Sequence, residues 1–416
     1  MENQLVVSPE ELYGGINAAA QKTRIRQLLD AYGEAFPVET EPFLFSVPGR
    51  TEIGGNHTDH NRGKVIAASI GLDMLAASSP SDDGRVVLLS QGFEKIELSV
   101  DALDPVPEER GSSIALVRGV LAGMRREGFR IGGFRAVIDS AIPAGAGLSS
   151  SAAFEILVAS VLNHLYNSAQ ISPQRLALIA REAEHTYFGK ACGLMDQMTV
   201  AMGGFVSIDF KNPESPLVES IPFRFEGSEH TLCIVDTRTG HADMSDEYTS
   251  IPSEMSAVAG FFSCKALRQI TKADVILNIR ALREQFGDRA VLRSMHFFDE
   301  NKRVERLAYA LKKNDVDAFL SNVSKSGNSS AKYLQNSFCT SRPEEQALSL
   351  ALYTAEKILC CRGACRVHGG GFAGTIQAFV PNDRMIAFVG ALDNVFGSGC
   401  CRPLTIRTKG AVRISL

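Results

Sequence analysis

The hydrophobic positions of the chain follow two spacings, which predict a mixture of helices and strands. Apolar residues recur at helical spacing over residues 9–35, 112–127, 149–166, 172–187, 247–268, 274–286, 302–312, 315–323 and 344–359. Shorter apolar runs bounded by turn residues predict strands at 43–47, 65–70, 74–77, 85–89, 96–100, 133–139, 205–210 and 232–235. Two glycine-containing strand segments, 365–380 and 403–414, end the pattern.

Composition limits the class of protein. With 416 residues the chain has room for about two or three domains, and the turn-rich stretch 212–216 suggests a boundary after residue 210. The net charge of −4 argues against a nucleic-acid partner, and no apolar run is long enough to span a membrane. The N-terminal residues do not resemble a signal peptide, so we expect a cytoplasmic protein whose nine cysteines are reduced thiols.

One group of cysteines needs separate consideration. Cys360, Cys361, Cys365 and His368 lie within nine residues, and zinc could use three of them. No second cysteine pair stands at zinc-knuckle spacing, and the residues lie at the end of an expected helix and on a strand. We therefore expect no metal there.

Residues 141–157 predict a site for a phosphate group. Gly145 and Gly147 lack Cβ atoms, which allows a ligand to approach the backbone, and the serines 149–151 stand where a helix begins. The free N–H groups and the positive dipole end of a helix bind anions. The segment is neither a Walker A loop nor a Rossmann loop. An ordinary serine-capped helix start is the alternative interpretation.

Two further segments favour a binding role. Residues 50–60 concentrate polar side chains between expected strands, and such loops commonly bind ligands, with a solvated loop as the alternative: Arg50, Glu52, Asn56, His57, Asp59 and His60. Three consecutive glycines at 369–371 indicate close approach of backbone or ligand, or else a structural turn.

These segments together resemble a known family. Residues 48–61, 143–153 and 366–374 resemble the three signature motifs of the GHMP small-molecule kinases, and the first resembles the galactokinase signature in particular. The sequence Gly-Leu-Met-Asp-Gln at 193–197 adds to the likeness, which covers nearly the whole chain. The resemblance implies an α+β fold of two domains, 1–210 and 211–416, with the active site in the cleft between them.

The resemblance also assigns the phosphate and metal chemistry. It implies that Asp196 is the catalytic aspartate and that Arg50 lies close to it. It implies that Ser151 and Glu184 are ligands of Mg²⁺, a hard cation that prefers oxygen. The residues expected to bind ATP are Pro143, Gly145, Gly147, Leu148, Ser149, Ser150, Ser151, Gly370 and Gly371.

The expected sugar contacts match the family less completely. His57, Asp59, Gly193 and Tyr248 match positions that hold the sugar. Asn56 stands where galactokinases carry a glutamate facing the 6-hydroxyl, and a neutral amide there would tolerate an acidic or altered C6 group. Further departures from the family pattern are Glu52, His60 and His368.

Three functions are therefore compatible with the sequence. The first is an ATP-dependent sugar 1-kinase, a galactokinase, which acts on small molecules as a monomer. The second is a kinase of galacturonate or of another galactose-like sugar altered at C6. The third is a sensor of sugar and ATP without catalysis, which the retained serines, Glu184 and Asp196 argue against.

Overall fold

The computed structural model describes residues 6–36, 41–143, 147–190, 193–240 and 245–415. The chain divides into two compact units: unit 1 comprises residues 1–50, 69–204 and 407–416, and unit 2 comprises residues 51–68 and 205–406. Strands β2 (Phe43–Gly54) and β3 (Lys64–Ser81) contribute residues to both. Within unit 2 the start of β3 pairs antiparallel with β7 (Phe205–Asp209).

Unit 1 is built on a mixed sheet. The start of β2 pairs antiparallel with β13, which pairs parallel with β1, and the end of β3 pairs antiparallel with β6. Strand β6 pairs parallel with β4, which pairs antiparallel with β5. The bounds of these strands are β1 Val6–Val7, β4 Arg85–Ser90, β5 Ile96–Ser99, β6 Gly133–Ser140 and β13 Val412–Ile414.

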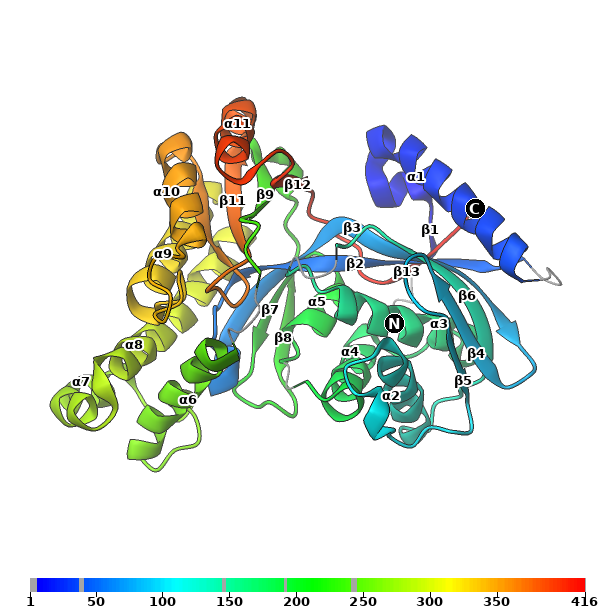
Figure 1. Cartoon of the computed structure of the whole chain (residues 1–416), viewed down its shortest axis with the longest axis horizontal. Coiled ribbons are helices and arrows are strands. Elements are labelled where there is room, and N and C mark those ends of the chain that lie inside the picture. The colour runs from blue at the N-terminus through cyan, green and yellow to red at the C-terminus, as the bar shows by residue number, and fades with distance from the viewer. Residues whose placement is uncertain (1–5, 37–40, 144–146, 191–192, 241–244, 416) are drawn as a thin grey trace. The chain divides into compact units, whose positions relative to one another are not determined.

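Helices cover both sides of this sheet (Figure 1). Helix α1 (Pro9–Ala35) packs Ile25 and Leu28 against Leu75 and Ala77 of β3, on the face opposite to α2–α5. The other helices of the unit are α2 Ser113–Arg126, α3 Ser150–Asn167, α4 Pro173–Glu182 and α5 Met195–Met202, with a π-helical turn at Ala183–Phe188 and a 3₁₀ turn at Pro107–Glu109.

Unit 2 contains an antiparallel sheet in the order β10-β11-β9-β12. Alternate residues of β11, such as Ile376 and Ala378, face helices α10 and α11, whereas Phe379 faces Phe319 of α9 with ring centroids 5.2 Å apart. The strands are β8 Leu217–Ile221, β9 His230–Asp236, β10 Ala364–His368, β11 Thr375–Pro381 and β12 Cys401–Leu404.

The helices of unit 2 account for most of its length. They are α6 Ser245–Phe261, α7 Lys272–Leu277, α8 Ile279–Lys312, α9 Val316–Ser329, α10 Ala347–Leu359 and α11 Met385–Phe396. Shorter turns are the π-helical Ser330–Leu334 and the 3₁₀ segments Asp59–Asn61, Phe225–Gly227, Leu267–Gln269 and Asn382–Arg384. None of the helices in the described ranges is long and apolar enough to cross a membrane.

The structure confirms the mixed fold and changes several element bounds. The strands expected at 65–70 and 74–77 are one strand, β3, and β2 continues to Gly54, so the polar loop begins only after it. Helix α8 joins two expected helices across Gly287, which has a left-handed φ of 84°. Pairing partners far away in sequence extend these elements beyond what local apolar spacing indicates.

Candidate active site

In unit 1, strand β2 meets the turn that precedes helix α3. The N–H of Arg50 donates to the carbonyl of Leu148 at 3.2 Å. A Cβ atom on Gly49 would lie 2.8 Å from that same carbonyl oxygen, so only glycine allows this approach. Leu148 is buried, which anchors the turn, while Gly147 is exposed with φ 68°. The turn is thereby fixed to the sheet immediately before the helix begins.

Arg50, Ser149 and Asp196 form a single hydrogen-bonded group. The Arg50 guanidinium donates to both carboxylate oxygens of Asp196, at 2.7 and 2.6 Å, and to the Gly147 carbonyl at 2.5 Å. The Ser149 hydroxyl donates to Asp196 Oδ2 at 2.5 Å. Burial would raise the pKa of the Asp196 carboxyl, but Arg50 and Ser149 outweigh it and lower that pKa, so the group is ionised at neutral pH.

Helix α3 begins without a side-chain cap. Ser149 adopts a left-handed conformation (φ 61°), and its hydroxyl bonds Asp196 rather than the N–H groups of the first helical turn. The N–H groups at the start of α3 therefore have no capping side chain, as a phosphate-binding helix start requires. This arrangement differs from the serine-capped helix that was the alternative interpretation.

Ser151 and Glu184, which the family resemblance implies as metal ligands, lie in contact. The Ser151 hydroxyl donates to Glu184 Oε1 at 3.3 Å, and the Lys190 ammonium lies 3.0 Å from the same oxygen. Glu184 is only 2% exposed and belongs to the π-helical turn, a feature common at functional sites. A hydroxyl and a carboxylate oxygen of this kind suit a hard divalent cation.

Two buried residues next to this pair were not predicted. The side-chain amide of Gln197 donates to Glu184 Oε2 at 2.7 Å and to Glu155 Oε2 at 3.0 Å. Burial and the nearby Glu184 raise the pKa of Glu155 well above its ordinary value. The signal was present in the sequence as a glutamate inside the apolar face of α3, where a charged side chain is unusual.

In unit 2 the glycine segment 369–371 is held by its carbonyl groups. The Tyr248 hydroxyl donates to the Gly371 carbonyl at 2.8 Å, and the tyrosine ring leaves no room for a Cβ on Gly370 (2.3 Å). Gly371 has φ 86°, and a Cβ there would lie 2.2 Å from the Asn336 carbonyl oxygen. The glycines are thus required by close packing, and Tyr248 holds the segment through the Gly371 carbonyl.

Asn56 lies at the centre of a buried network. Its amide nitrogen donates to Glu52 Oε1 at 3.1 Å and to the Gly369 carbonyl at 2.7 Å. Its oxygen accepts from the Asn336 amide at 2.8 Å and from the Ser330 hydroxyl at 3.4 Å. An amide side chain offers two donors and two acceptor positions, so protein groups occupy all four. A sugar contact through this amide would require one of these partners to leave.

His57 and Asp59 follow at the edge of this network. His57 Nε2 lies 3.0 Å from the Gly370 carbonyl and therefore carries the proton, while Nδ1 is buried and has no protein partner among the described residues. Burial, followed by the neighbouring His60, lowers the pKa of His57 to about 4, so its ring is neutral and Nδ1 can accept a hydrogen bond. Asp59 begins the short 3₁₀ helix, and its Oδ1 lies 3.6 Å from Nε2 of His60.

Buried polar groups that the sequence does not single out hold the backbone of residues 55 and 56. Glu300 accepts from the Gly55 N–H at 3.0 Å and pairs with Arg303, while His296 Nε2 lies 3.0 Å from the Asn56 carbonyl. Burial would raise the pKa of Glu300, but the surrounding His296, Arg303 and Arg366 lower it to about 2. These residues lie more than two hundred positions from Asn56 in sequence, and no local motif marks them.

The remaining predicted residues are placed less informatively. Pro143 and Gly193 are half-buried, and Ser150 is the first residue of α3. Gly145 lies outside the described residues.

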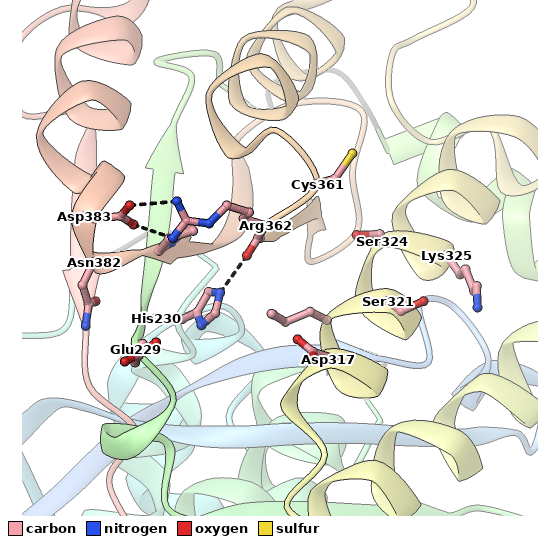
Figure 2. A pocket seen from close by; sticks show the side chains of 13 residues that line it. Glu229, His230, Asp317, Ser321, Ser324, Lys325, Cys361, Arg362, Asn382 and Asp383 are labelled. Carbon is pink, nitrogen blue, oxygen red and sulfur yellow. Dashed lines mark hydrogen bonds and ion pairs between the residues drawn. The ribbon is translucent and has the colours of Figure 1, made fainter.

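A cavity of about 950 Å³ lies elsewhere in unit 2, between β9, α9 and the turn after α10 (Figure 2). Within its lining, Arg362 pairs with Asp383 at 2.8 Å, and both ring nitrogens of His230 face backbone carbonyls. None of the predicted site residues lines it. We therefore assign the chemistry to the hydrogen-bonded groups described above rather than to this cavity.

The cysteines expected to be thiols are free in the described part of the chain. Cys360 and Cys361 are exposed, whereas His368 is buried and bonded to Thr51 and Thr375, so these residues form no metal cluster. A different trio, Asp393, Cys400 and Cys401, lies close together, with the Cys400 thiol 3.3 Å from Asp393 Oδ1. A thiol–carboxylate hydrogen bond accounts for that grouping.

Comparison with known proteins identifies the family. Residues 115–204 match the GHMP kinases N terminal domain, and residues 30–80 match the galactokinase galactose-binding signature. A galactokinase of Streptomyces coelicolor is 31% identical over 373 residues, which cover 89% of this chain and 92% of that protein. A galactokinase of Thermotoga petrophila is 31% identical over 331 residues, covering 79% and 87%.

Solved structures agree on the fold. The galactokinase of Lactococcus lactis, crystallised with galactose, superimposes with a TM-score of 0.78 at 22% identity, covering 93% of this chain and 99% of that one. Mevalonate kinase of Methanococcus jannaschii gives a TM-score of 0.62 at 15% identity, covering 89% and 99%. The α+β fold expected from the sequence is confirmed as a GHMP kinase fold, and the chain belongs to the galactokinase family.

Proposed function

We propose that this protein is an ATP-dependent galactokinase, which transfers the γ-phosphoryl group of ATP to the 1-hydroxyl of galactose. The observation that carries the proposal is the Arg50–Asp196–Ser149 group at the uncapped start of α3. It combines an anion-binding helix end with an ionised carboxylate and a fixed guanidinium. Phosphoryl transfer depends on positioning and charge neutralisation by such groups more than on covalent chemistry.

Asp196 is suited to orient the attacking hydroxyl. A carboxylate offers about four acceptor positions, and Arg50 and Ser149 use three of them. One position on Oδ1 is left for the sugar hydroxyl. Because its pKa is lowered, Asp196 is a weak base that aligns the hydroxyl and takes its proton late, when the bond to phosphorus has begun to form.

Arg50 neutralises charge and holds the geometry. Its guanidinium is fixed by Asp196 and by the Gly147 carbonyl, which leaves one N–H on each terminal nitrogen for phosphate oxygens. A guanidinium held in this way needs little reorganisation when charge develops on the transferred group. The ATP phosphates would lie along residues 147–151, at the start of α3.

Ser151 and Glu184 would hold Mg²⁺. Their oxygens converge, and in this structure the Lys190 ammonium supplies the positive charge that the buried Glu184 carboxylate needs. When bound, the cation would neutralise phosphate charge and fix the phosphate orientation. The two side chains contribute one neutral and one anionic oxygen, and the remaining ligands would be phosphate oxygens and water.

Galactose is the proposed sugar, with His57, Asp59, Gly193 and Tyr248 as its contacts. Nδ1 of His57, which has no protein partner in the described part of the chain, is the acceptor proposed for a sugar hydroxyl. The case for an acidic sugar depended on the neutral amide of Asn56 in place of a glutamate; that amide hydrogen-bonds to protein groups through both its nitrogen and its oxygen, which supports galactose over a sugar recognised through Asn56. A monomeric state, a cytoplasmic location and the absence of nucleic-acid or membrane partners stay predictions.

The test is an ADP-release assay over a panel of free sugars that includes galactose, galacturonate and glucose. We expect turnover with galactose and little with galacturonate. Asp196→Asn keeps the shape of the side chain but removes its charge, and should lower kcat by at least about 10²-fold while calorimetry still detects galactose and ATP. Near-normal turnover of this variant would refute the role of Asp196, and binding without turnover in the unaltered protein would favour the sensor.

A further inference from the structure

A buried hydrogen-bonded bridge connects three elements of unit 1. Glu155 on α3 and Gln197 on α5 are both fully buried, and Glu184 in the π-helical turn is 2% exposed. One amide nitrogen, Gln197 Nε2, donates to Glu155 Oε2 at 3.0 Å and to Glu184 Oε2 at 2.7 Å. The bridge thus reaches Oε2 of Glu184, whereas Ser151 and Lys190 bond Oε1.

The chemistry of the bridge fixes the orientation of Gln197. Both hydrogens of its amide nitrogen are directed at carboxyl oxygens, and a flipped amide would lose both bonds and place its oxygen against the acceptor oxygen Glu184 Oε2. Gln197 therefore has a single favourable rotamer as long as both glutamates are present. That rotamer defines where Glu184 Oε2 can lie, and so where Oε1 points.

Fold stability does not explain Glu155. Its Oε1 has no hydrogen-bond partner in the described parts of the chain, and neither does Gln197 Oε1. A buried carboxyl with an unsatisfied oxygen is unfavourable, and replacing such groups by apolar side chains of similar size is often neutral or stabilising. A role in the function of the site is the remaining reason for a carboxyl at this position.

We propose that Glu155 is a positioning residue that acts through Gln197 to hold the Glu184 carboxylate in its metal-binding orientation. Since Gln197 directly follows Asp196, the same bridge connects the metal side of the site to the helix that carries the catalytic carboxylate. The inference rests on the proposed function, because it takes Glu184 as the metal ligand. Residues that orient a metal ligand in this way typically change metal affinity 10- to 100-fold when mutated, as a rough guide.

The experiment compares Glu155→Met with Glu155→Gln in the full chain. Methionine fills the space but accepts no hydrogen bond from the Gln197 amide, whereas glutamine keeps an acceptor oxygen. The first readout is the Mg²⁺ midpoint, the Mg²⁺ concentration that gives half-maximal activity at saturating sugar. The second, which does not depend on activity, is the Mn²⁺ affinity in the presence of ADP, measured by electron paramagnetic resonance. Glu155→Met should raise the Mg²⁺ midpoint and lower the Mn²⁺ affinity, each by about tenfold, with an unchanged or higher Tm. Glu155→Gln should give the same Mg²⁺ midpoint and Mn²⁺ affinity as the unaltered protein.

Reference variants separate this inference from the proposed function. Ser151→Ala and Glu184→Gln test the metal site itself, and unchanged midpoints in both would overturn that site. If they weaken metal binding and Glu155→Met does not, the positioning role alone is wrong. Equal loss in Glu155→Met and Glu155→Gln would also overturn it. Should Glu155→Met not fold, Gln197→Met provides the same comparison, and an unchanged Mn²⁺ affinity there would refute the bridge.

Discussion

The replacement Asn56→Asp tests whether this side chain serves the protein network or the sugar. It changes one NH₂ group to an oxygen and leaves the size of the side chain the same. In the structure that nitrogen lies 3.1 Å from Glu52 Oε1 and 2.7 Å from the Gly369 carbonyl. The variant therefore replaces two favourable hydrogen bonds by two contacts between oxygens, one of them between carboxylates.

The size of the effect follows from these distances. Two unit charges about 3 Å apart repel by about 5 kcal/mol at an effective dielectric of 20. Arg366 pairs with Glu52 at 2.7 Å and offsets part of this repulsion. We expect a net loss of about 3 kcal/mol at pH 7.5, including the lost hydrogen bonds.

The loss should depend on pH in a defined direction. Crowding between the Glu52 carboxyl and the carboxyl introduced at position 56 raises the folded-state pKa of one of them above its unfolded value. The penalty is therefore relieved as pH falls through that raised pKa. The assay is the Tm of the variant and of the unaltered protein between pH 5 and 8. The Tm difference should shrink toward pH 5, because a single proton then bridges the two carboxyls.

Two further measurements decide the interpretation. The double variant Glu52→Gln/Asn56→Asp removes the repulsion and should be more stable than Asn56→Asp alone. The ratio of galacturonate to galactose activity should stay constant, because the amide faces protein groups. The network interpretation would be refuted if the Tm difference did not depend on pH and the double variant were no more stable than Asn56→Asp. A changed ratio of galacturonate to galactose activity would place Asn56 against the sugar.

Two other predictions follow from the close contacts and buried charges. Gly49→Ala should displace the turn before α3, because its Cβ would lie 2.8 Å from the Leu148 carbonyl oxygen; we expect a higher KM for ATP in steady-state assays, and a KM equal to that of the unaltered protein would contradict this. Glu300, with a folded pKa of about 2 against an ordinary value of 4.5, contributes stability above about pH 4.5 that is lost as pH falls toward 2. The free energy of unfolding of the unaltered protein should exceed that of Glu300→Gln at neutral pH, and this difference should shrink by about 3 kcal/mol on acidification. Urea unfolding at each pH measures the difference, and a difference that stays constant would exclude this linkage.

Local motifs allow part of the site to be predicted. The helix start at residues 149–151 and the polar loop after β2 are short segments whose residue types suit their chemistry directly. The contact of Ser151 with Glu184 is also predicted, through the family resemblance. The left-handed backbone of Ser149 is not, because the hydroxyl cannot be assigned to Asp196 rather than to its own helix without the fold.

The parts that sequence could not predict depend on distant partners. The neighbours of Asn56 in sequence suggest a sugar contact, whereas the structure surrounds its amide with protein groups. Its partners Ser330 and Asn336 lie in and just after a π-helical turn, about 280 positions further along the chain. Which groups satisfy a buried amide is decided by packing at that range, and neither spacing nor composition encodes it.

The two buried networks also explain why unusual residues are tolerated at these positions. Glu155 and Glu52 are buried carboxyl groups, and each meets an amide, Gln197 or Asn56 respectively. In each case the amide donates both hydrogens and so transmits the position of the carboxylate to another group, Glu184 in unit 1 and the Gly369 carbonyl in unit 2. A carboxylate–amide pair of this kind fixes orientation more narrowly than apolar packing, because a flipped amide loses both bonds. Glu155→Met should therefore change activity by moving the carboxylate of Glu184, and Asn56→Asp by moving the glycine segment at Gly369. Neither side chain touches the transferred phosphoryl group.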